Sequence, residues 1–214
     1  MKSVLLIGLG RFGRHMAQKF YEQGNDVMAV DILEDRVNIV LPYVTNAQIG
    51  DATDEMFLDS LGIDNYDLCV VTIGDNFQNS LETTALLKDL GANYILSRAS
   101  RDVHAKFLLR NGADEVIYTE KETAERLAVK FGSDSIFNYI ELNKDFSIYE
   151  ISVPKSWIGK SILQKNVRSK YNISILAIKV GETILPLPHP DHVFTADEIL
   201  MVLGRNEDVE RLIK

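Results

Sequence analysis

Cysteine and long apolar stretches are nearly absent from this 214-residue sequence. Its single cysteine, Cys69, cannot form an intramolecular disulfide, so we expect the protein to work in a reducing cytoplasm. No run comes close to the roughly 18 apolar residues that would cross a bilayer. The N-terminal residues carry one lysine and a short apolar run that leads into a glycine motif. This pattern predicts a first strand and not a cleaved signal peptide.

The sequence also lacks an excess of basic residues. It has 23 Lys and Arg against 31 Asp and Glu, which gives a formal net charge of −8. A broad nucleic-acid footprint needs clustered positive charge, so we expect no nucleic-acid partner. For the same reason we expect contact with a membrane only through a protein partner. The content of 46% hydrophobic and 25% charged residues is that of an average soluble globular protein, so collagen, coiled coil and disorder are poor starting points.

Apolar strands and amphipathic helices alternate along the first two thirds of the chain. Residues 26–31 and 66–74 are typical of strands, and the second run is apolar on both faces, as in a buried parallel sheet. Residues 14–24 place Met16, Ala17 and Phe20 at helical spacing. Six such strand–helix units predict an α/β fold with a Rossmann-like, doubly wound parallel sheet. We expect this domain to occupy residues 1–133.

The pattern changes after that point, and residues 134–214 predict a separate, small α+β domain. We expect a strand at 147–153, a helix at 160–172, a hairpin that turns near Gly181 and Glu182, and a strand at 199–204. Asn206 is a natural N-cap for a last helix. These elements amount to four short strands and two helices.

The strongest chemical signal is a glycine motif that follows the first strand and opens the first helix. It has the G-x-G-x-x-G spacing of phosphate-binding loops in βαβ units. The first glycine permits the tight turn, the second lets a pyrophosphate approach the backbone, and the third lets helix and strand pack closely. The helix N-terminus offers unpaired N–H groups to phosphate. The predicted loop consists of Gly8, Leu9, Gly10, Arg11, Phe12 and Gly13.

Two charged residues refine this prediction. Asp31 ends the second strand beside Ile32, where a carboxylate accepts hydrogen bonds from ribose hydroxyls and repels a 2′-phosphate. It could equally cap the helix that follows. Arg11 places a cation at the positive end of a helix dipole, which a bound anion would offset. Arg11 therefore indicates a ligand rich in phosphate, such as ADP or ATP, unless it is simply a solvated side chain.

Further candidate ligand contacts lie at the carboxyl ends of the later strands, where open α/β sheets bind ligands. Asp51 could accept from an adenine amino group or cap the next helix. Arg98 could reach phosphate. Glu120 could hold a phosphate-bound cation or favour the first turn of its helix. The candidates at these strand ends are Asp51, Ala52, Ile73, Gly74, Asp75, Arg98, His104 and Glu120.

Catalytic patterns are missing beside this loop. Tyr118 and Lys121 are one residue too close for the pair of short-chain dehydrogenases, and Cys69 lies in an apolar strand where a thiol is inert. His189 and His192 with Asp191 form a poor metal cage in a proline-containing loop. We therefore expect a regulatory binding protein and not an enzyme, and we keep a small NAD-dependent oxidoreductase as the alternative.

Several segments together resemble the RCK domain, the regulator of potassium conductance. They are IGLGRFG at 7–13, AVD at 29–31, IGDAT at 49–53, VVTIGDN at 70–76 and GAD at 112–114. The segment NVRSKYNISILAIKVG at 166–181 resembles the RCK C-terminal (TrkA-C) domain. The resemblance covers the whole chain and is strongest to the gating subunits of Ktr and Trk potassium uptake systems.

This resemblance implies a cytoplasmic gating subunit at the inner face of the cell membrane. Such subunits assemble from dimers into an octameric ring, bind ATP, ADP or NAD(H), and open or close a membrane potassium-translocating subunit of the KtrB or TrkH type. By position, Arg11 would reach the terminal phosphate across the dimer, and Glu120 would lie near it with a cation such as Mg or Na. In some relatives the C-terminal domain binds cyclic di-AMP, for which Arg168, Ile175 and Ile178 are the candidates here.

Overall fold

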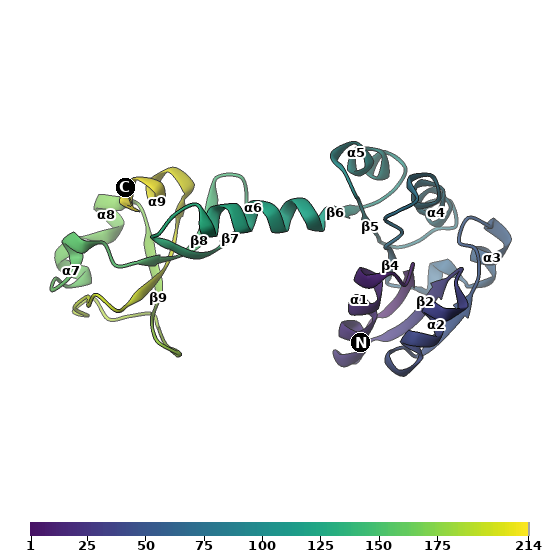
Figure 1. Cartoon of the computed structure of the whole chain (residues 1–214), viewed down its shortest axis with the longest axis horizontal. Coiled ribbons are helices and arrows are strands. Elements are labelled where there is room, and N and C mark those ends of the chain that lie inside the picture. The colour runs from purple at the N-terminus through teal and green to yellow at the C-terminus, as the bar shows by residue number, and fades with distance from the viewer. Residues whose placement is uncertain (214) are drawn as a thin grey trace. The chain divides into compact units, whose positions relative to one another are not determined.

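The computed structural model describes residues 1–213, which divide into two compact units after Glu120, the first formed by Met1–Glu120 and the second by the residues from Lys121 onward. Figure 1 shows both units and labels most of their helices and strands. No helix within residues 1–213 is long and apolar enough to span a lipid bilayer.

A six-stranded parallel sheet forms the centre of the first unit. Its order is β3-β2-β1-β4-β5-β6, so the chain starts in the middle and winds outward in both directions, which confirms the predicted doubly wound fold. The strands are β1 (Ser3–Ile7), β2 (Asp26–Asp31), β3 (Asn46–Ile49), β4 (Leu68–Val71), β5 (Ile95–Arg98) and β6 (Glu115–Ile117).

Both faces of this sheet are buried under helices. Alternate residues of β1 face opposite sides, so Val4 and Leu6 pack with α1 and α2, whereas Leu5 and Ile7 pack with α3, α4 and α5. The central strands β1 and β4 are apolar along almost their whole length for this reason. The helices that cover it are α1 (Arg11–Glu22), α2 (Glu34–Val40), α3 (Glu55–Ser60), α4 (Phe77–Asp89) and α5 (Asp102–Arg110), and α6 (Thr119–Phe131) begins where this unit ends.

The second unit contains an antiparallel sheet, with the order β10-β9-β11-β8-β7. Trp157, Ile151 and Leu200 are fully buried in its core, against which Val129 of α6 also packs. The predicted hairpin is confirmed as β9 and β10. The elements are β7 (Ile136–Glu141), β8 (Phe146–Ser152), α7 (Ile162–Lys165), α8 (Val167–Tyr171), β9 (Ser174–Val180), β10 (Thr183–Pro186), β11 (Ile199–Arg205) and α9 (Asn206–Ile213).

Three predictions for this unit were wrong in detail. Residues 121–213 contain five strands, since 136–141 pairs with β8 as an additional edge strand. The helix expected at 160–172 is divided into α7 and α8, because Asn166 takes a left-handed conformation at φ 47°. The side-chain oxygen of Asn206 accepts hydrogen bonds from the Ser147 and Tyr149 hydroxyls, so it does not cap its helix.

The two compact units divide at the start of α6, since residues from Lys121 onward belong to the second unit. Our predicted domain boundary at 133 and 134 follows this helix. That the two domains fold separately on either side of residues 133 and 134 stays a prediction.

Candidate functional site

A cleft of about 690 Å³ opens at the carboxyl ends of the strands in the first unit. This is the edge at which doubly wound sheets bind ligands, because the strand order reverses between β1 and β4. Most of the predicted ligand contacts line it together, although they come from six separate segments of the chain. They are Gly8, Gly10, Arg11, Phe12, Asp31, Ile32, Asp51, Ala52, Ile73, Gly74, Asp75, Arg98 and Glu120.

The glycine loop has the geometry that its spacing predicts. Gly8 has a φ of 92°, which favours glycine. A Cβ on Gly13 would lie 2.0 Å from the carbonyl oxygen of Gly8, so α1 can pack this closely on β1 only without a side chain there. A Cβ on Gly10 would meet nothing within 4 Å. Gly10 therefore leaves open space where a ligand can approach the backbone.

Two loop residues serve the fold and do not line the cleft. Gly13 makes the close helix contact, and Leu9 is fully buried among Val4, Ala17 and neighbouring apolar residues. Thr72 follows β4 and stabilises the turn between β1 and α1, because its hydroxyl donates to the carbonyl oxygens of Gly8 and Ile7. This threonine lines the cleft, and it belongs to the segment 70–76 that the sequence singled out, although it was not among the candidate contacts.

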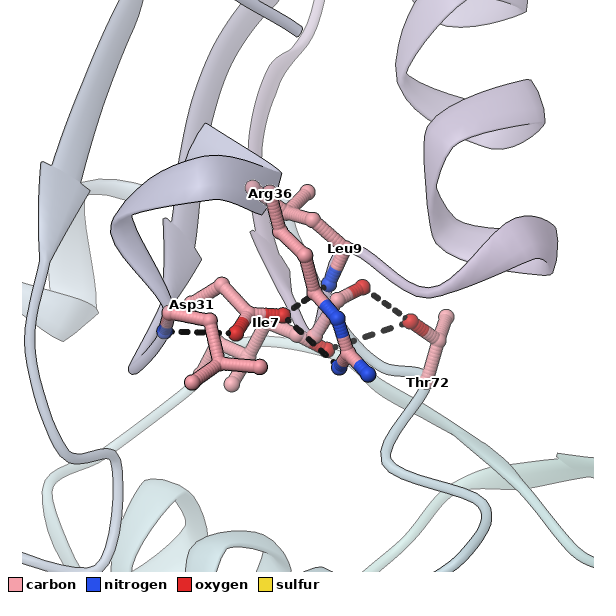
Figure 2. A network of polar contacts seen from close by, with 7 residues as sticks. Ile7, Leu9, Asp31, Arg36 and Thr72 are labelled. Atoms are coloured by element: carbon pink, nitrogen blue, oxygen red, sulfur yellow. Dashed lines mark hydrogen bonds and ion pairs between the residues drawn. The ribbon is translucent and has the colours of Figure 1, made fainter. Parts of the chain in front are cut away.

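Asp31 lies at the end of β2 and is only 5% exposed. Its Oδ2 accepts the backbone N–H of Leu9 at 2.6 Å, and its Oδ1 accepts that of Leu33 at 2.9 Å. Arg36 on α2 completes the group, with Nη1 3.5 Å from Oδ2, as Figure 2 shows. Asp31 thus ties the glycine loop to the start of α2 and faces the cleft at the same time.

Arg11 is the first residue of α1 and lies exposed at the mouth of the cleft. The first turn of α1, which the structure describes in full, contains no acidic residue. The guanidinium therefore adds to the positive end of the helix dipole, as its position in the sequence predicted. This end of the cleft favours an anion.

Arg98 and Glu120 meet across the far side of the cleft. They form an ion pair and a hydrogen bond through Arg98 Nη2 and Glu120 Oε1. The backbone N–H of Glu120 and then Arg98 lower the pKa of the Glu120 carboxyl, so it is ionised at neutral pH. The guanidinium also lies 5.6 Å from the centre of the Phe12 ring. A Cβ on Gly74 would lie 2.8 Å from Arg98 Nη1, so Gly74 makes room for this side chain.

Two buried polar atoms on the cleft wall have no hydrogen-bond partner within residues 1–213. They are Arg98 Nε and Thr119 Oγ1. Buried polar groups are normally hydrogen-bonded, so these two atoms indicate that this wall of the cleft forms hydrogen bonds with a ligand or with water. Thr119 gave no signal in the sequence.

Asp51 lies on the cleft wall, but neither of its sequence interpretations describes its present contacts. It accepts hydrogen bonds from the backbone N–H of Thr53 at 2.9 Å and from its hydroxyl at 2.7 Å, which lower the pKa of its carboxyl. Asp54, and not Asp51, caps α3, because its side chain accepts from the N–H groups of Met56 and Phe57. The suggested adenine contact of Asp51 stays a prediction.

The structure does not bring His104 into the cleft. Its side chain is fully buried between α4 and α5, where Nε2 lies 3.2 Å from the Ser80 hydroxyl and the ring packs against Phe77. Burial lowers the pKa of His104, and the nearby charge of Arg101 lowers it further. His104 is therefore a neutral packing residue, and its predicted ligand contact was wrong.

Other side chains line the cleft although no motif marked them. Arg36 is the most informative, since it lies five positions after Asp31 on the next helix and reaches back to it. An arginine five positions after the acid, at the start of the next helix, was therefore a sequence signal for this ion pair. The wall also includes His15 and Asn79, which no sequence motif contained, and Thr53 and Asn76, which belong to the segments 49–53 and 70–76 but were not among the candidate contacts.

A second, smaller hollow of about 350 Å³ lies in the second unit beside α7 and α8. Arg168 and Ile175 line it with Asn166, Pro188 and Pro190. Ile178 does not, because it is 1% exposed in the core of that unit. Two of the three predicted residues therefore share one hollow.

Comparison with known proteins identifies both units. Residues 4–119 match the TrkA-N domain family, and residues 147–214 match the TrkA-C domain family. The chain is 39% identical over 213 residues to the Ktr system potassium uptake protein C of Bacillus subtilis, which covers 100% of this chain and 96% of that protein. It is also 39% identical over 210 residues to the Ktr system potassium uptake protein A of the same organism, with 98% and 95% covered.

Solved structures agree on the fold. A structure described as the GsuK channel matches with a TM-score of 0.73 at 18% identity, and covers 99% of this chain but 39% of that one. A structure of the GsuK channel bound to NAD matches with a TM-score of 0.72. This chain therefore spans less than half of the channel chains. By its two domain matches and its similarity over the whole length to the Ktr proteins, the chain belongs to the TrkA-N and TrkA-C family of potassium uptake proteins.

Proposed function

We propose that this protein is a cytoplasmic gating subunit of a potassium uptake transporter, controlled by an adenine nucleotide in the cleft of its first unit. The residues that line this cleft are the main support for the proposal. A glycine loop at a helix N-terminus, an acid at the end of β2 and a free-standing arginine at the mouth are the groups that phosphate and ribose require. ATP, ADP and NAD(H) share those groups.

The proposed ligand regulates and is not turned over. A ligand can shift a conformational equilibrium only by its difference in affinity for the two states. Arg11, Arg98 and Glu120 surround the place where terminal phosphates would lie, so ATP and ADP would differ most there. Glu120 is ionised, and could share a cation such as Mg or Na with phosphate oxygens once Arg98 turns to the phosphate. The oxidoreductase alternative would instead need hydride transfer from NADH.

We further propose that the protein acts as a homo-oligomer, in a ring of eight subunits built from dimers, on a membrane potassium-translocating subunit. The similarity over the whole chain to the Ktr proteins supports this, since those are parts of a potassium uptake system. The chain would then reach the membrane only through its partner, as the net charge of −8 also favours.

The second unit is a candidate site for cyclic di-AMP. The support is the resemblance of 166–181 to the RCK C-terminal domain together with the hollow that Arg168 and Ile175 line. Arg168 is suited to a phosphate, because a guanidinium can donate two parallel hydrogen bonds. A filter-binding assay with radiolabelled cyclic di-AMP tests this site on the full-length protein, which we expect to retain the ligand at micromolar concentration. If the unit serves only in oligomerisation, the protein will retain none.

One experiment tests the main proposal directly. The full-length protein is co-expressed with a Ktr-type membrane subunit and purified through that subunit, with ATP, with ADP or with neither. We expect co-purification, and a nucleotide-dependent change in potassium flux when the complex is placed in vesicles. Calorimetry with ATP, ADP and NADH measures binding separately. Absence of binding to all three contradicts the nucleotide proposal, and NADH oxidation with a substrate would favour the oxidoreductase.

A further inference from the structure

The loop between β10 and β11, residues 187–198, forms part of the wall of the second hollow. Pro188 and Pro190 line the hollow from this loop, whereas Leu163 and Arg168 line it from α7 and α8. The wall therefore has two parts that come from separate segments of the chain. The shape of the hollow depends on how the loop and the helices are held together.

Two backbone hydrogen bonds join the 187–198 loop to the start of α7. The N–H of Leu163 donates to the carbonyl oxygen of Pro190 at 2.8 Å. The N–H of Ile162 donates to the carbonyl oxygen of His192 at 3.1 Å. Because the first N–H groups of a helix have no acceptor within the helix, the loop supplies the acceptors that α7 lacks. The position of α7 therefore depends on where the loop is held.

His192 ties this loop to the core of the second unit. Its Nε2 lies 2.9 Å from Oε1 of Glu198, whose side chain is 5% exposed just before β11. An ionised carboxylate only accepts hydrogen bonds, so Nε2 is the donor in this contact. Oε2 of Glu198 accepts the backbone N–H of Thr195 at 3.1 Å. The imidazole ring also packs edge-on against Phe194, which is buried beside Trp157. Each oxygen of the buried carboxylate thus holds one residue of the loop.

A second histidine in the same loop has a different environment. His189 lies at the surface, with its side chain 78% exposed and its Nδ1 3.4 Å from Oδ2 of Asp191. Within the described residues, neither His189 nor His192 lines the hollow. The loop therefore contains one histidine that is anchored in the core and one that is not, and a ligand in the hollow would touch neither.

We infer that His192 is a positioning residue for the second hollow. Through its hydrogen bond to Glu198 it fixes the part of the loop that holds the start of α7, so the two parts of the wall keep one arrangement before a ligand binds. A site that has its binding shape for only part of the time shows an affinity reduced by that fraction. His192 therefore raises the affinity of the hollow without touching the ligand. The inference rests on the proposed binding of cyclic di-AMP.

The test measures cyclic di-AMP binding to immobilised full-length protein by surface plasmon resonance. His192→Phe keeps an aromatic ring beside Phe194 but cannot donate to Glu198. In this variant we expect the affinity to fall about tenfold, the effect of one hydrogen bond to a charged group. The loss should appear as slower association with an unchanged dissociation rate, because fewer molecules have the binding shape.

Two further variants test the cause of this loss. His192→Gln keeps a side-chain N–H that can reach Glu198 and should recover most of the association rate. His189→Phe is the matched control in the same loop and should bind like the parent. Unfolding followed by the fluorescence of the buried Trp157 checks that the second unit of each variant folds. If His192→Phe does not fold, the double variant His192→Phe with Glu198→Leu leaves no buried carboxylate without its donor, and it should show the same slow association.

Three results would overturn the inference while the proposed site stands. One is parent affinity in a folded His192→Phe. Another is a loss caused by faster dissociation, the usual effect of a lost contact, since His192 would then touch the ligand. The third is an equal loss in His192→Phe and His189→Phe, which would be a general effect of changes in the loop. A parent that binds no cyclic di-AMP contradicts the proposed site itself, and this result is distinct because it appears before any variant is compared.

Discussion

At the scale of single residues, Arg11 is the side chain on which we expect the choice between ATP and ADP to depend. It belongs to the glycine loop that would hold the first phosphates, and its exposed side chain lines the cleft. Arg11→Ala should therefore reduce ATP affinity more than ADP affinity, by about 1.5–3 kcal/mol, the size of a charge-assisted hydrogen bond. Paired calorimetric titrations measure this, with size-exclusion chromatography to check the oligomer. Equal losses for both nucleotides would make Arg11 a general phosphate contact.

Asp31 has a ligand role and a structural role, and two substitutions separate them. Asp31→Ala should weaken ATP, ADP and NADH alike. It should also lower the free energy of unfolding by about 1–3 kcal/mol, because the N–H groups of Leu9 and Leu33 lose their acceptor. Asp31→Asn keeps one acceptor oxygen and should recover part of the stability but little of the affinity. Urea unfolding and calorimetry report the two quantities. Lost stability with unchanged affinity would limit Asp31 to holding the loop.

At the scale of elements, the close contact between α1 and the end of β1 gives two glycines of the loop different roles, Gly13 in packing and Gly10 in ligand access. A methyl group at Gly13 meets the Gly8 carbonyl oxygen and the Thr72 hydroxyl, whereas one at Gly10 meets open space. Gly13→Ala should destabilise the protein by about 1–3 kcal/mol or more, as overpacking does. Gly10→Ala should leave the unfolding temperature unchanged and weaken nucleotide binding. The two unfolding temperatures decide this, and equal losses of stability would contradict it.

The packing of α4 on α5 should make stability depend on pH through His104. Burial lowers the pKa of His104 in the folded protein, so the unfolded chain takes up a proton at a higher pH. The stability that this residue contributes is complete above its ordinary pKa of about 6.5 and is lost as the pH falls below it. Unfolding temperatures measured at about pH 7.5 and 5.5 should fall further in the parent than in His104→Gln. His15, His189 and His192 remain in both proteins, so an identical fall in both would contradict the prediction.

At the scale of the whole molecule, the two units have separate cores and only one contains the proposed nucleotide cleft. The single tryptophan, Trp157, is buried in the other unit, so its fluorescence reports unfolding there alone. A ligand at 100 times its Kd stabilises the state that binds it by about 2.7 kcal/mol. ADP should therefore raise an unfolding temperature seen by calorimetry and leave the Trp157 transition unchanged. An equal shift in both signals would show that the units unfold together.

Much of this architecture follows from local patterns. The helices of the first unit and its parallel strands follow from alternating apolar periods, and the glycine loop follows from spacing within six residues. Asn166 shows the limit of such patterns, because the residues on both sides of it are helical and only its left-handed backbone conformation separates α7 from α8. His104 shows another limit. A histidine near a strand end can face the cleft or the neighbouring helix, and periodicity alone did not choose between them.

The sequence by itself determined the doubly wound sheet, the phosphate loop and the acid at the end of β2, since each depends on residues close together in the chain. Only the tertiary structure decided that Arg98 pairs with Glu120 and that Ile178 is buried away from the second hollow. Arg98 and Glu120 are 22 residues apart in the sequence, and their contact exists because β5 and β6 are neighbours in the sheet. Side-chain pairing across such distances depends on the finished backbone, and no pattern along the chain encodes it.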